Sequence, residues 1–131
     1  MIVVLDASAA IEVVLQRDFA SQIAEVILKA DWVIAPNLYI SEVANVFWKY
    51  QKLAHHPYEE CEKNIDQAIA LPDEFITEID LYREAFNVAC MLGHPVYDMM
   101  YLVLARRHSA ILLTKDKKLS AAAKKSGLRV L

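Results

Sequence analysis

The feature that most constrains the fold is an unbroken apolar run from Met99 to Ala105. The run is longer than a typical strand, and a helix that is apolar all round has to be buried in a core. Pro95 ends the preceding segment, because proline disfavours helix at the residue before it. A core helix is therefore predicted to begin near Val96. Asp98 lies in or beside its first turn, at the positive end of the helix dipole.

Short apolar runs alternate with segments of helical periodicity along the rest of the chain. Runs of this kind are typical of strands that are buried on both faces of a parallel sheet. The alternation predicts an α/β domain with a mainly parallel sheet of four to five short strands flanked by helices. Strands are predicted over residues 2–5, 32–35, 73–76 (weak, at an edge), 110–113 and 128–131. Helices are predicted over residues 9–15, 19–29, 38–53, 59–71, 80–92, 96–105 and 119–125.

Individual residues predict where several of these helices begin and end, and which side of one helix faces the core. Asp18 and Asn37 are suited to cap the two helices that follow them. Gly93 is a plausible residue just past a helix end, where a left-handed conformation is common. In the helix over residues 80–92, the periodicity predicts that Tyr82, Ala85, Phe86 and Ala89 face inward.

A chain of 131 residues predicts a single domain over residues 1–131. Since 56% of its residues are hydrophobic, apolar surface is expected beyond the core, which favours an oligomer or a binding partner. Cys61 and Cys90 lack metal-ligand spacing and are expected to be buried, reduced thiols. The histidines also lack metal-ligand spacing and are expected to be structural or on the surface. They are His55, His56, His94 and His108.

Neither a targeting segment nor a membrane span is expected from the sequence. The apolar run over residues 2–5 is too short for the core of a signal peptide and has no basic residues before it. No segment reaches the roughly 18 uncharged apolar residues that a membrane helix needs. These patterns predict a cytoplasmic protein without membrane contact.

Charge is distributed unevenly, although the net charge is only −3. Acidic residues dominate between Glu59 and Glu84, whereas from Arg106 onward eight Lys and Arg residues accompany one acid, Asp116. A local basic field of this kind attracts phosphates. The same pattern also fits the solvated face of an amphipathic helix, and the sequence leaves both interpretations open.

Four acids are predicted to meet at the carboxyl edge of the sheet. Asp6 directly follows the first strand, and Thr114 and Asp116 follow the strand over residues 110–113. Glu42 and Asp98 lie early in helices that reach the same edge. In an open parallel sheet, ligands bind at this edge, where the strand order reverses.

Each acid also has a purely structural interpretation. Asp6, Asp98 and Asp116 are each placed to cap the following helix. Glu42 would need a salt bridge, because a lone carboxylate on an apolar helix turn is costly. If the four do cluster, their pKa values rise unless a cation neutralises them. Mg²⁺ or Mn²⁺ suits such a site, since it binds one or two carboxylates, keeps several waters and leaves room for a substrate phosphate.

Four motifs occur in order along the chain: VLDAS at residues 4–8, SEVAN at 41–45, YD at 97–98 with Tyr101 behind it, and LTKD at 113–116. Together they resemble the PIN-domain family of metal-dependent ribonucleases, and specifically the VapC-type toxins of toxin–antitoxin pairs. The resemblance implies a Rossmann-like sheet with a protruding helical pair. It also implies an RNA substrate, a homodimer, and a cognate antitoxin that inserts a segment near the site.

The resemblance further implies a catalytic site in which Asp6, Glu42, Asp98 and Asp116 hold Mg²⁺ or Mn²⁺. Asp6 and Asp98 would be direct ligands. Asp116 would complete the site, together with Glu42, which would act through water or as a base. Ser8 and Thr114 would hydrogen-bond to the ligands.

Two other functions remain open beside a metal-dependent endoribonuclease toxin. One is another Mg²⁺-dependent phosphoryl hydrolase on a similar sheet. A haloacid-dehalogenase-like phosphatase would need a second acid two residues after Asp6, where Ser8 stands. The other is a non-catalytic PIN-like binding module whose acids only cap helices.

Overall fold

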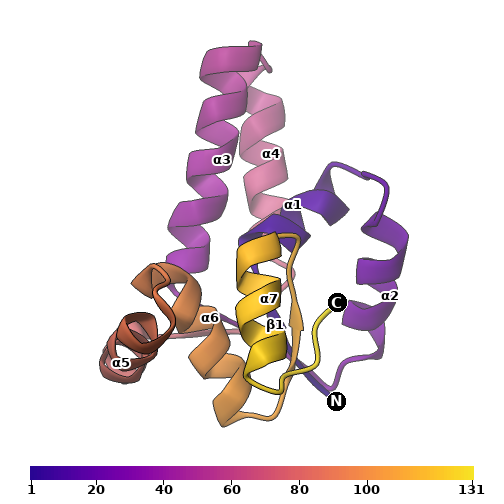
Figure 1. Cartoon of the computed structure of the whole chain (residues 1–131). Helices are drawn as coiled ribbons and strands as arrows, with labels where there is room; N and C mark the ends of the chain where they lie inside the picture. Colours follow the sequence, from indigo (N-terminus) through magenta and orange to yellow (C-terminus); the bar gives the residue numbers. More distant parts are fainter.

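The computed structural model describes residues 1–131 and shows a parallel sheet surrounded by helices (Figure 1). Its four strands are β1 (Ile2–Leu5), β2 (Trp32–Pro36), β3 (Glu74–Ile76) and β4 (Ile111–Leu113). They lie in the order β3-β2-β1-β4, and all three pairings are parallel. The α/β class and the short β3 edge strand are therefore confirmed.

Seven α-helices and one 3-10 helix connect the strands. Figure 1 shows α3 and α4 side by side as a projection that rises above the rest of the molecule. This confirms the protruding helical pair. The helices are α1 (Ala7–Val14), α2 (Ala20–Lys29), α3 (Leu38–Ala54), α4 (Tyr58–Ile69), η1 (Glu78–Asp80), α5 (Tyr82–Leu92), α6 (Val96–Arg107) and α7 (Lys117–Lys125).

Helix α6 is the central helix of the core. It begins at Val96, directly after Pro95, and every residue from Met99 to Ala105 is buried. It contacts β1, β2 and β4, and it also packs against α5 and α7. Because neighbours surround the helix, it needs apolar residues on all of its faces. No single helix has the length and composition to cross a membrane, and only α5 and α6 taken together reach that threshold, with a bend of 111° between them.

The strand order reverses between β1 and β4. The chain passes from β1 to β2 to β3 in one direction and then crosses to β4, on the other side of β1. Val4 pairs with Ile34 of β2 on one side and with Leu112 of β4 on the other. The backbone N–H of Asp6 donates to the carbonyl oxygen of Leu113 at 2.9 Å, so the ends of β1 and β4 lie together. Residues that follow these two strands therefore meet at one edge.

The predicted last strand over residues 128–131 is wrong as a full strand. Only Val130 forms a parallel bridge, with Leu112. Leu131 completes the pairing with two backbone hydrogen bonds, to Leu112 and Thr114. Strand β4 pairs with β1 over all three of its residues, but the chain end lies along β4 only around Leu112.

Neither of the two predicted helix caps forms, whereas the predicted end of α5 is confirmed. Helix α2 begins after Phe19 rather than Asp18, and the carboxylate of the buried Glu12 accepts the Phe19 N–H at 3.2 Å. Asn37 occupies the position before α3, but its side chain makes no capping hydrogen bond. Gly93 ends α5 with φ +67°, a left-handed conformation that glycine adopts without strain.

The predicted orientation of α5 is confirmed for Ala85 and Ala89 and wrong for Tyr82 and Phe86. Tyr82 and Phe86 are 43% and 62% exposed, whereas Ala85 and Ala89 are buried. Helix α5 packs along α6. Small alanines at this contact let the two helices approach closely, which turns the aromatic side chains outward. On the same helix Cys90 is exposed, contrary to expectation, while Cys61 on α4 is buried as expected.

The central position of α6 predicts a large stability difference between two leucines. Leu104 is 1% exposed and Leu53, near the end of α3, is 72% exposed. Leu104→Ala should lower the free energy of unfolding by about 2–5 kcal/mol, since it removes buried contacts and leaves a cavity. Leu53→Ala should change it by less than about 0.5 kcal/mol. Urea denaturation of both variants measures this, and equal losses would contradict the burial of α6.

Candidate functional site

Asp6 directly follows β1 and is 6% exposed. The hydroxyls of Ser8 and Thr114 both donate to its Oδ2, each at 2.6 Å. Ser8 Oγ also accepts the N–H of Lys115 at 2.9 Å, and Thr114 Oγ1 accepts the N–H of Asp116 at 3.0 Å. Because a backbone donor occupies each hydroxyl oxygen, the single proton of each hydroxyl is directed to the carboxylate. Asp6 is thus fixed in one orientation.

The second carboxylate oxygen of Asp6 remains available. Oδ1 accepts no hydrogen bond within the chain, since both hydroxyls contact Oδ2. No fully buried side-chain nitrogen or oxygen in the structure lacks a hydrogen-bond partner. Oδ1 must therefore keep contact with solvent, which leaves it free to bind a ligand.

An open cleft of about 280 Å³ lies at this edge of the sheet. All four predicted acids line it, although they come from positions spread between residues 6 and 116. Asp6 follows β1, Glu42 lies in the second turn of α3, Asp98 lies in the first turn of α6, and Asp116 precedes α7. The structure therefore brings together the four acids that the sequence places at one edge.

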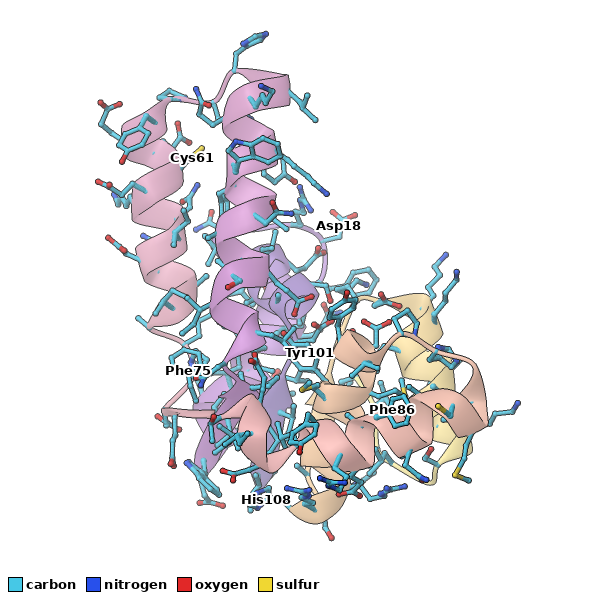
Figure 2. All side chains as sticks on the ribbon, turned by 90° about the vertical axis from the view of Figure 1, so that its left-hand side faces the viewer. Asp18, Cys61, Phe75, Phe86, Tyr101 and His108 are labelled. Atoms are coloured by element: carbon cyan, nitrogen blue, oxygen red, sulfur yellow. The ribbon has the colours of Figure 1, made fainter.

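Glu42 is tied to α6 through a tyrosine rather than through a salt bridge. The hydroxyl of Tyr101 donates to Glu42 Oε1 at 2.6 Å. Figure 2 shows Tyr101 where α3 and α6 meet. None of the ion pairs in the chain includes Glu42. The salt-bridge interpretation of Glu42 is therefore wrong.

The capping interpretation holds for only one of the three aspartates. Asp116 Oδ1 accepts the N–H of Leu119 at 2.9 Å, which caps α7. Asp6 occupies the position before α1, but its side chain makes no capping bond. Asp98 lies in the first turn of α6, where Pro95 takes the capping position.

Burial and mutual repulsion raise the pKa values of the two most enclosed acids. Burial raises the pKa of Asp6, and the charges of Asp116 and Asp98 raise it further, against the lowering effect of the two hydroxyls that bind its carboxylate. For Glu42, burial and the charges of the other three acids raise the pKa to about 7, despite the hydrogen bond from Tyr101. Each charge therefore disfavours ionisation of its neighbours.

Asp98 is half-buried, and the positive charges of two side chains act on it. Burial raises its pKa and the charge of Asp116 adds to the effect, while His94 and Lys118 lower it. Neither His94 nor Lys118 forms an ion pair with an acid of the cleft. The negative charge of the cleft is thus not neutralised by a direct partner within the chain.

The donor set fits a hard divalent cation. Its ligands are carboxylate oxygens, which Mg²⁺ and Mn²⁺ prefer, and no thiol or imidazole lines the cleft. No three His, Cys, Asp or Glu side chains are placed so that they enclose one metal ion together. The arrangement therefore suits an ion that takes one or two carboxylates directly and fills its remaining positions with water.

Sequence reasoning gave no individual role to two residues that line the cleft or to the tyrosine that orients Glu42. Asn45 and Lys49 line the cleft, three and seven residues after Glu42 on the same face of α3, so the helical spacing carried a signal for both. Tyr101 lies three residues after Asp98 on α6 and had been singled out only as part of a motif. Its contact with Glu42 depends on the packing of α3 against α6, which the sequence does not reveal.

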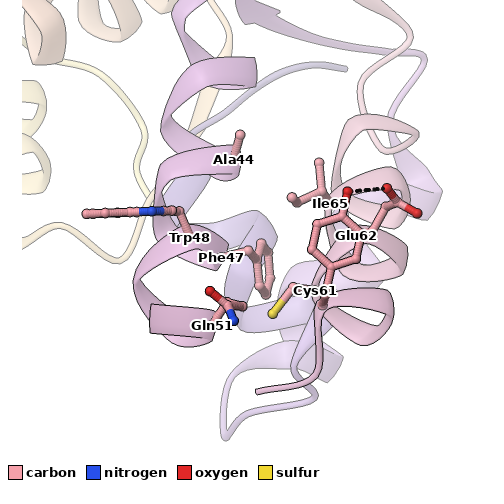
Figure 3. A pocket seen from close by; sticks show the side chains of 8 residues that line it. Ala44, Phe47, Trp48, Gln51, Cys61, Glu62 and Ile65 are labelled. Atoms are coloured by element: carbon pink, nitrogen blue, oxygen red, sulfur yellow. Dashed lines mark hydrogen bonds between the residues drawn. The ribbon is translucent and has the colours of Figure 1, made fainter. Parts of the chain in front are cut away.

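A second hollow, of about 250 Å³, lies between α3 and α4 in the projecting pair (Figure 3). Phe47, Trp48, Cys61 and Ile65 line it, and six of its eight lining residues are hydrophobic. It holds one carboxylate, Glu62, so it is not a second acidic cluster. Its surface is suited to apolar contacts.

Comparison with known proteins assigns the family to which this fold and cleft belong. The PIN domain model matches residues 3–125, and the chain belongs to the PIN-domain family. The crystal structure of PAE2754 from Pyrobaculum aerophilum is similar, with a TM-score of 0.76 and 23% identity over 98% of this chain and 82% of that chain.

A second similar structure is that of VapBC2 from Rickettsia felis bound to a DNA fragment from their promoter. Its TM-score is 0.69, with 17% identity over 100% of this chain and 98% of that chain. At such identities, both structures show a shared fold. No curated protein matches the chain.

The raised pKa values predict that the metal-free protein loses stability as pH rises. Between pH 4.5 and about 7 the folded state binds more protons than the unfolded state at Glu42, so the free energy of unfolding falls across this range. Glu42→Gln should reduce that loss by about 1–2 kcal/mol, after allowance for solvent screening. Urea denaturation in EDTA between these pH values measures the effect.

Glu60→Gln is the matched control, since it removes an exposed carboxylate of α4 without touching the cleft. An unchanged pH dependence in Glu42→Gln, or an equal reduction in Glu60→Gln, would contradict the electrostatic description of the cleft.

Proposed function

We propose that the protein is a metal-dependent endoribonuclease that hydrolyses RNA phosphodiester bonds, and that it is the VapC-like toxin of a toxin–antitoxin pair. One observation carries the proposal: four carboxylates from distant parts of a PIN domain line one cleft without an ion-pair partner. Membership of a family whose members are generally nucleases supports a hydrolase. On this proposal residues 1–131 form a single cytoplasmic domain.

Asp6 and Asp98 are proposed as the direct ligands of Mg²⁺ or Mn²⁺. Asp6 offers the free Oδ1, while Ser8 and Thr114 fix the other oxygen. Asp116 has one carboxylate oxygen left after it caps α7. A bound divalent ion supplies Lewis acidity toward phosphoryl oxygens and lowers the pKa of water.

Glu42 is proposed to hold and release a proton at Oε2. Its Oε1 accepts the hydroxyl of Tyr101, which orients the carboxylate and leaves Oε2 open to the cleft. Without a metal its pKa is about 7, and a bound cation would lower it, so Glu42 is ionised and able to act as a base at neutral pH. Glu42 is therefore placed to accept a proton from an attacking water near neutral pH.

Two protein partners belong to the proposal, a cognate antitoxin and a second copy of the chain. The apolar hollow between α3 and α4, with the exposed Trp48 beside it, supports an antitoxin that presents apolar side chains (Figure 3). On α5 the exposed Tyr82 and Phe86 lie one turn apart on the same face. Such an exposed aromatic pair supports a homodimer contact.

Metal binding is expected to stabilise the folded protein. Mn²⁺ at about 100 times its Kd should raise the free energy of unfolding of the wild type by about 2.7 kcal/mol. Asp98→Asn should lose most of this gain while it still folds, since Asn removes the charge and keeps the size. Thermal unfolding in a Mn²⁺ titration measures both. An equal gain in wild type and variant would place the ion outside the cleft.

Cleavage of RNA is expected to depend on both direct ligands. Asp6→Asn and Asp98→Asn should each lower the rate at least about 100-fold, as the loss of a charged group that binds a catalytic ion commonly costs several kcal/mol. The assay follows a fluorescent single-stranded RNA with Mg²⁺ or Mn²⁺, with Glu60→Gln as the control that keeps the wild-type rate. Wild-type cleavage by either aspartate variant, purified free of contaminating nuclease, would contradict the proposal.

A further inference from the structure

A basic groove lies directly beside the acidic cleft. It has a volume of about 390 Å³, and its walls include Lys117, Ser120, Ala121 and Lys124 of helix α7. Asp116 lines both the groove and the cleft, so the two hollows are adjacent at this residue. Only one of the seven residues that line the groove is hydrophobic.

The groove residues of α7 share one face of the helix. Lys117, Ser120, Ala121 and Lys124 are spaced by three, four and seven positions, which places them in one row. From Lys117 to Lys124 this row is about 10 Å long, given the helix rise of 1.5 Å per residue. That length exceeds the roughly 3.4 Å of duplex axis that corresponds to each phosphate of one strand, so the row can contact more than one phosphate.

The polar groups of this row have no partners within the chain. Neither Lys117 nor Lys124 takes part in an ion pair, and the hydroxyl of Ser120 makes no hydrogen bond. Lys115, which also lines the groove, has its Nζ 3.5 Å from the ring centroid of Phe19. The charge of Lys118 lowers the pKa of Asp98. Lys117 and Lys124 thus leave two unpaired positive charges on the wall of the groove, while Lys125 lies outside it.

The groove lies next to four carboxylates, where positive charge can offset the repulsion between these acids and a polyanionic strand. A polyanion is repelled by the acidic cleft, so a strand that is cut there needs cationic contacts close by. Lysine binds phosphate as a point charge. Lys49 supplies a further positive group on the α3 side of the cleft. A strand that crosses from Lys49 past Asp116 to α7 would have positive charge on both sides of the acids.

We infer that the α7 groove binds the phosphates that flank the cleavage position of single-stranded RNA. Lys117 and Lys124 contact successive phosphates, and Ser120 donates a hydrogen bond to a phosphate oxygen. Ala121 leaves room for the backbone of the strand. The inference deepens the proposed function and rests on it for the identity of the strand as RNA substrate.

Binding without cleavage tests the groove separately from the chemistry. Fluorescence anisotropy in EDTA follows a single-stranded RNA of about 12 nucleotides between about 50 and 200 mM salt. Lys117→Gln/Lys124→Gln should weaken binding at least tenfold at the lowest salt. It should also reduce the slope of log K against log salt by about 1.4, since each phosphate contact on a single strand contributes about 0.7. Ser120→Ala should weaken binding about fivefold.

Lys63→Gln/Lys125→Gln is the matched control, because it removes the same charge from exposed positions outside the groove. It should change binding less than twofold, and thermal unfolding should show that both double variants fold. The loss in the groove variant should be equal on DNA of the same sequence, since phosphates are common to both strands. A loss confined to RNA would contradict the assignment to phosphates.

The outcomes separate this inference from the proposed function. If the chain cuts RNA but the groove variant binds with wild-type affinity and slope, the groove assignment is overturned and the nuclease stands. If the chain cuts no RNA but binding depends on Lys117 and Lys124, the groove stands and the nuclease proposal fails. Equal losses in groove and control variants, or no binding by the wild type, would also overturn the groove.

Discussion

The junction between the ends of β1 and β4 is the constraint on which the site depends. The Asp6 N–H joins the end of β1 to Leu113, and the Asp6 carboxylate accepts the hydroxyls of Ser8 and Thr114. These bonds partly offset the cost of burying a carboxylate. They also determine which of its oxygens faces the cleft. The strand order reverses at the same place. The hydrogen bonds that fix Asp6 therefore lie at the edge of the sheet where ligands bind.

The cleft opposes the stability of the fold that holds it. Burial and repulsion raise the pKa values of Asp6, Glu42 and Asp98, which means that ionising all of them destabilises the folded chain. Helix α6 counters this through a continuous buried face against three strands. The repulsion among the carboxylates destabilises the folded chain without a cation. A bound cation removes this repulsion, so binding of the cation stabilises the folded state.

Much of the site was predictable because it follows from rules of sheet topology. Asp6 and Asp116 directly follow strands, and strands that are parallel end at one edge, so their meeting needed no knowledge of packing. Glu42 and Asp98 could be placed at the same edge because both lie early in helices that begin there. The contact between Tyr101 and Glu42, the hydrogen bond from the Phe19 N–H to Glu12 and the outward orientation of Phe86 were not predictable. Each depends on how two helices pack, which local periodicity does not specify.

The most direct test of the shared cation is a crystal grown or soaked in Mn²⁺, with anomalous diffraction to locate the ion. The arrangement predicts a peak in the cleft about 2.1 Å from an oxygen of Asp6 and an oxygen of Asp98. Asp116 and Glu42 should lie around it directly or through water. A well-ordered crystal with no peak in the cleft, or with Mn²⁺ bound only at acids elsewhere, would contradict a common metal site at the end of β1.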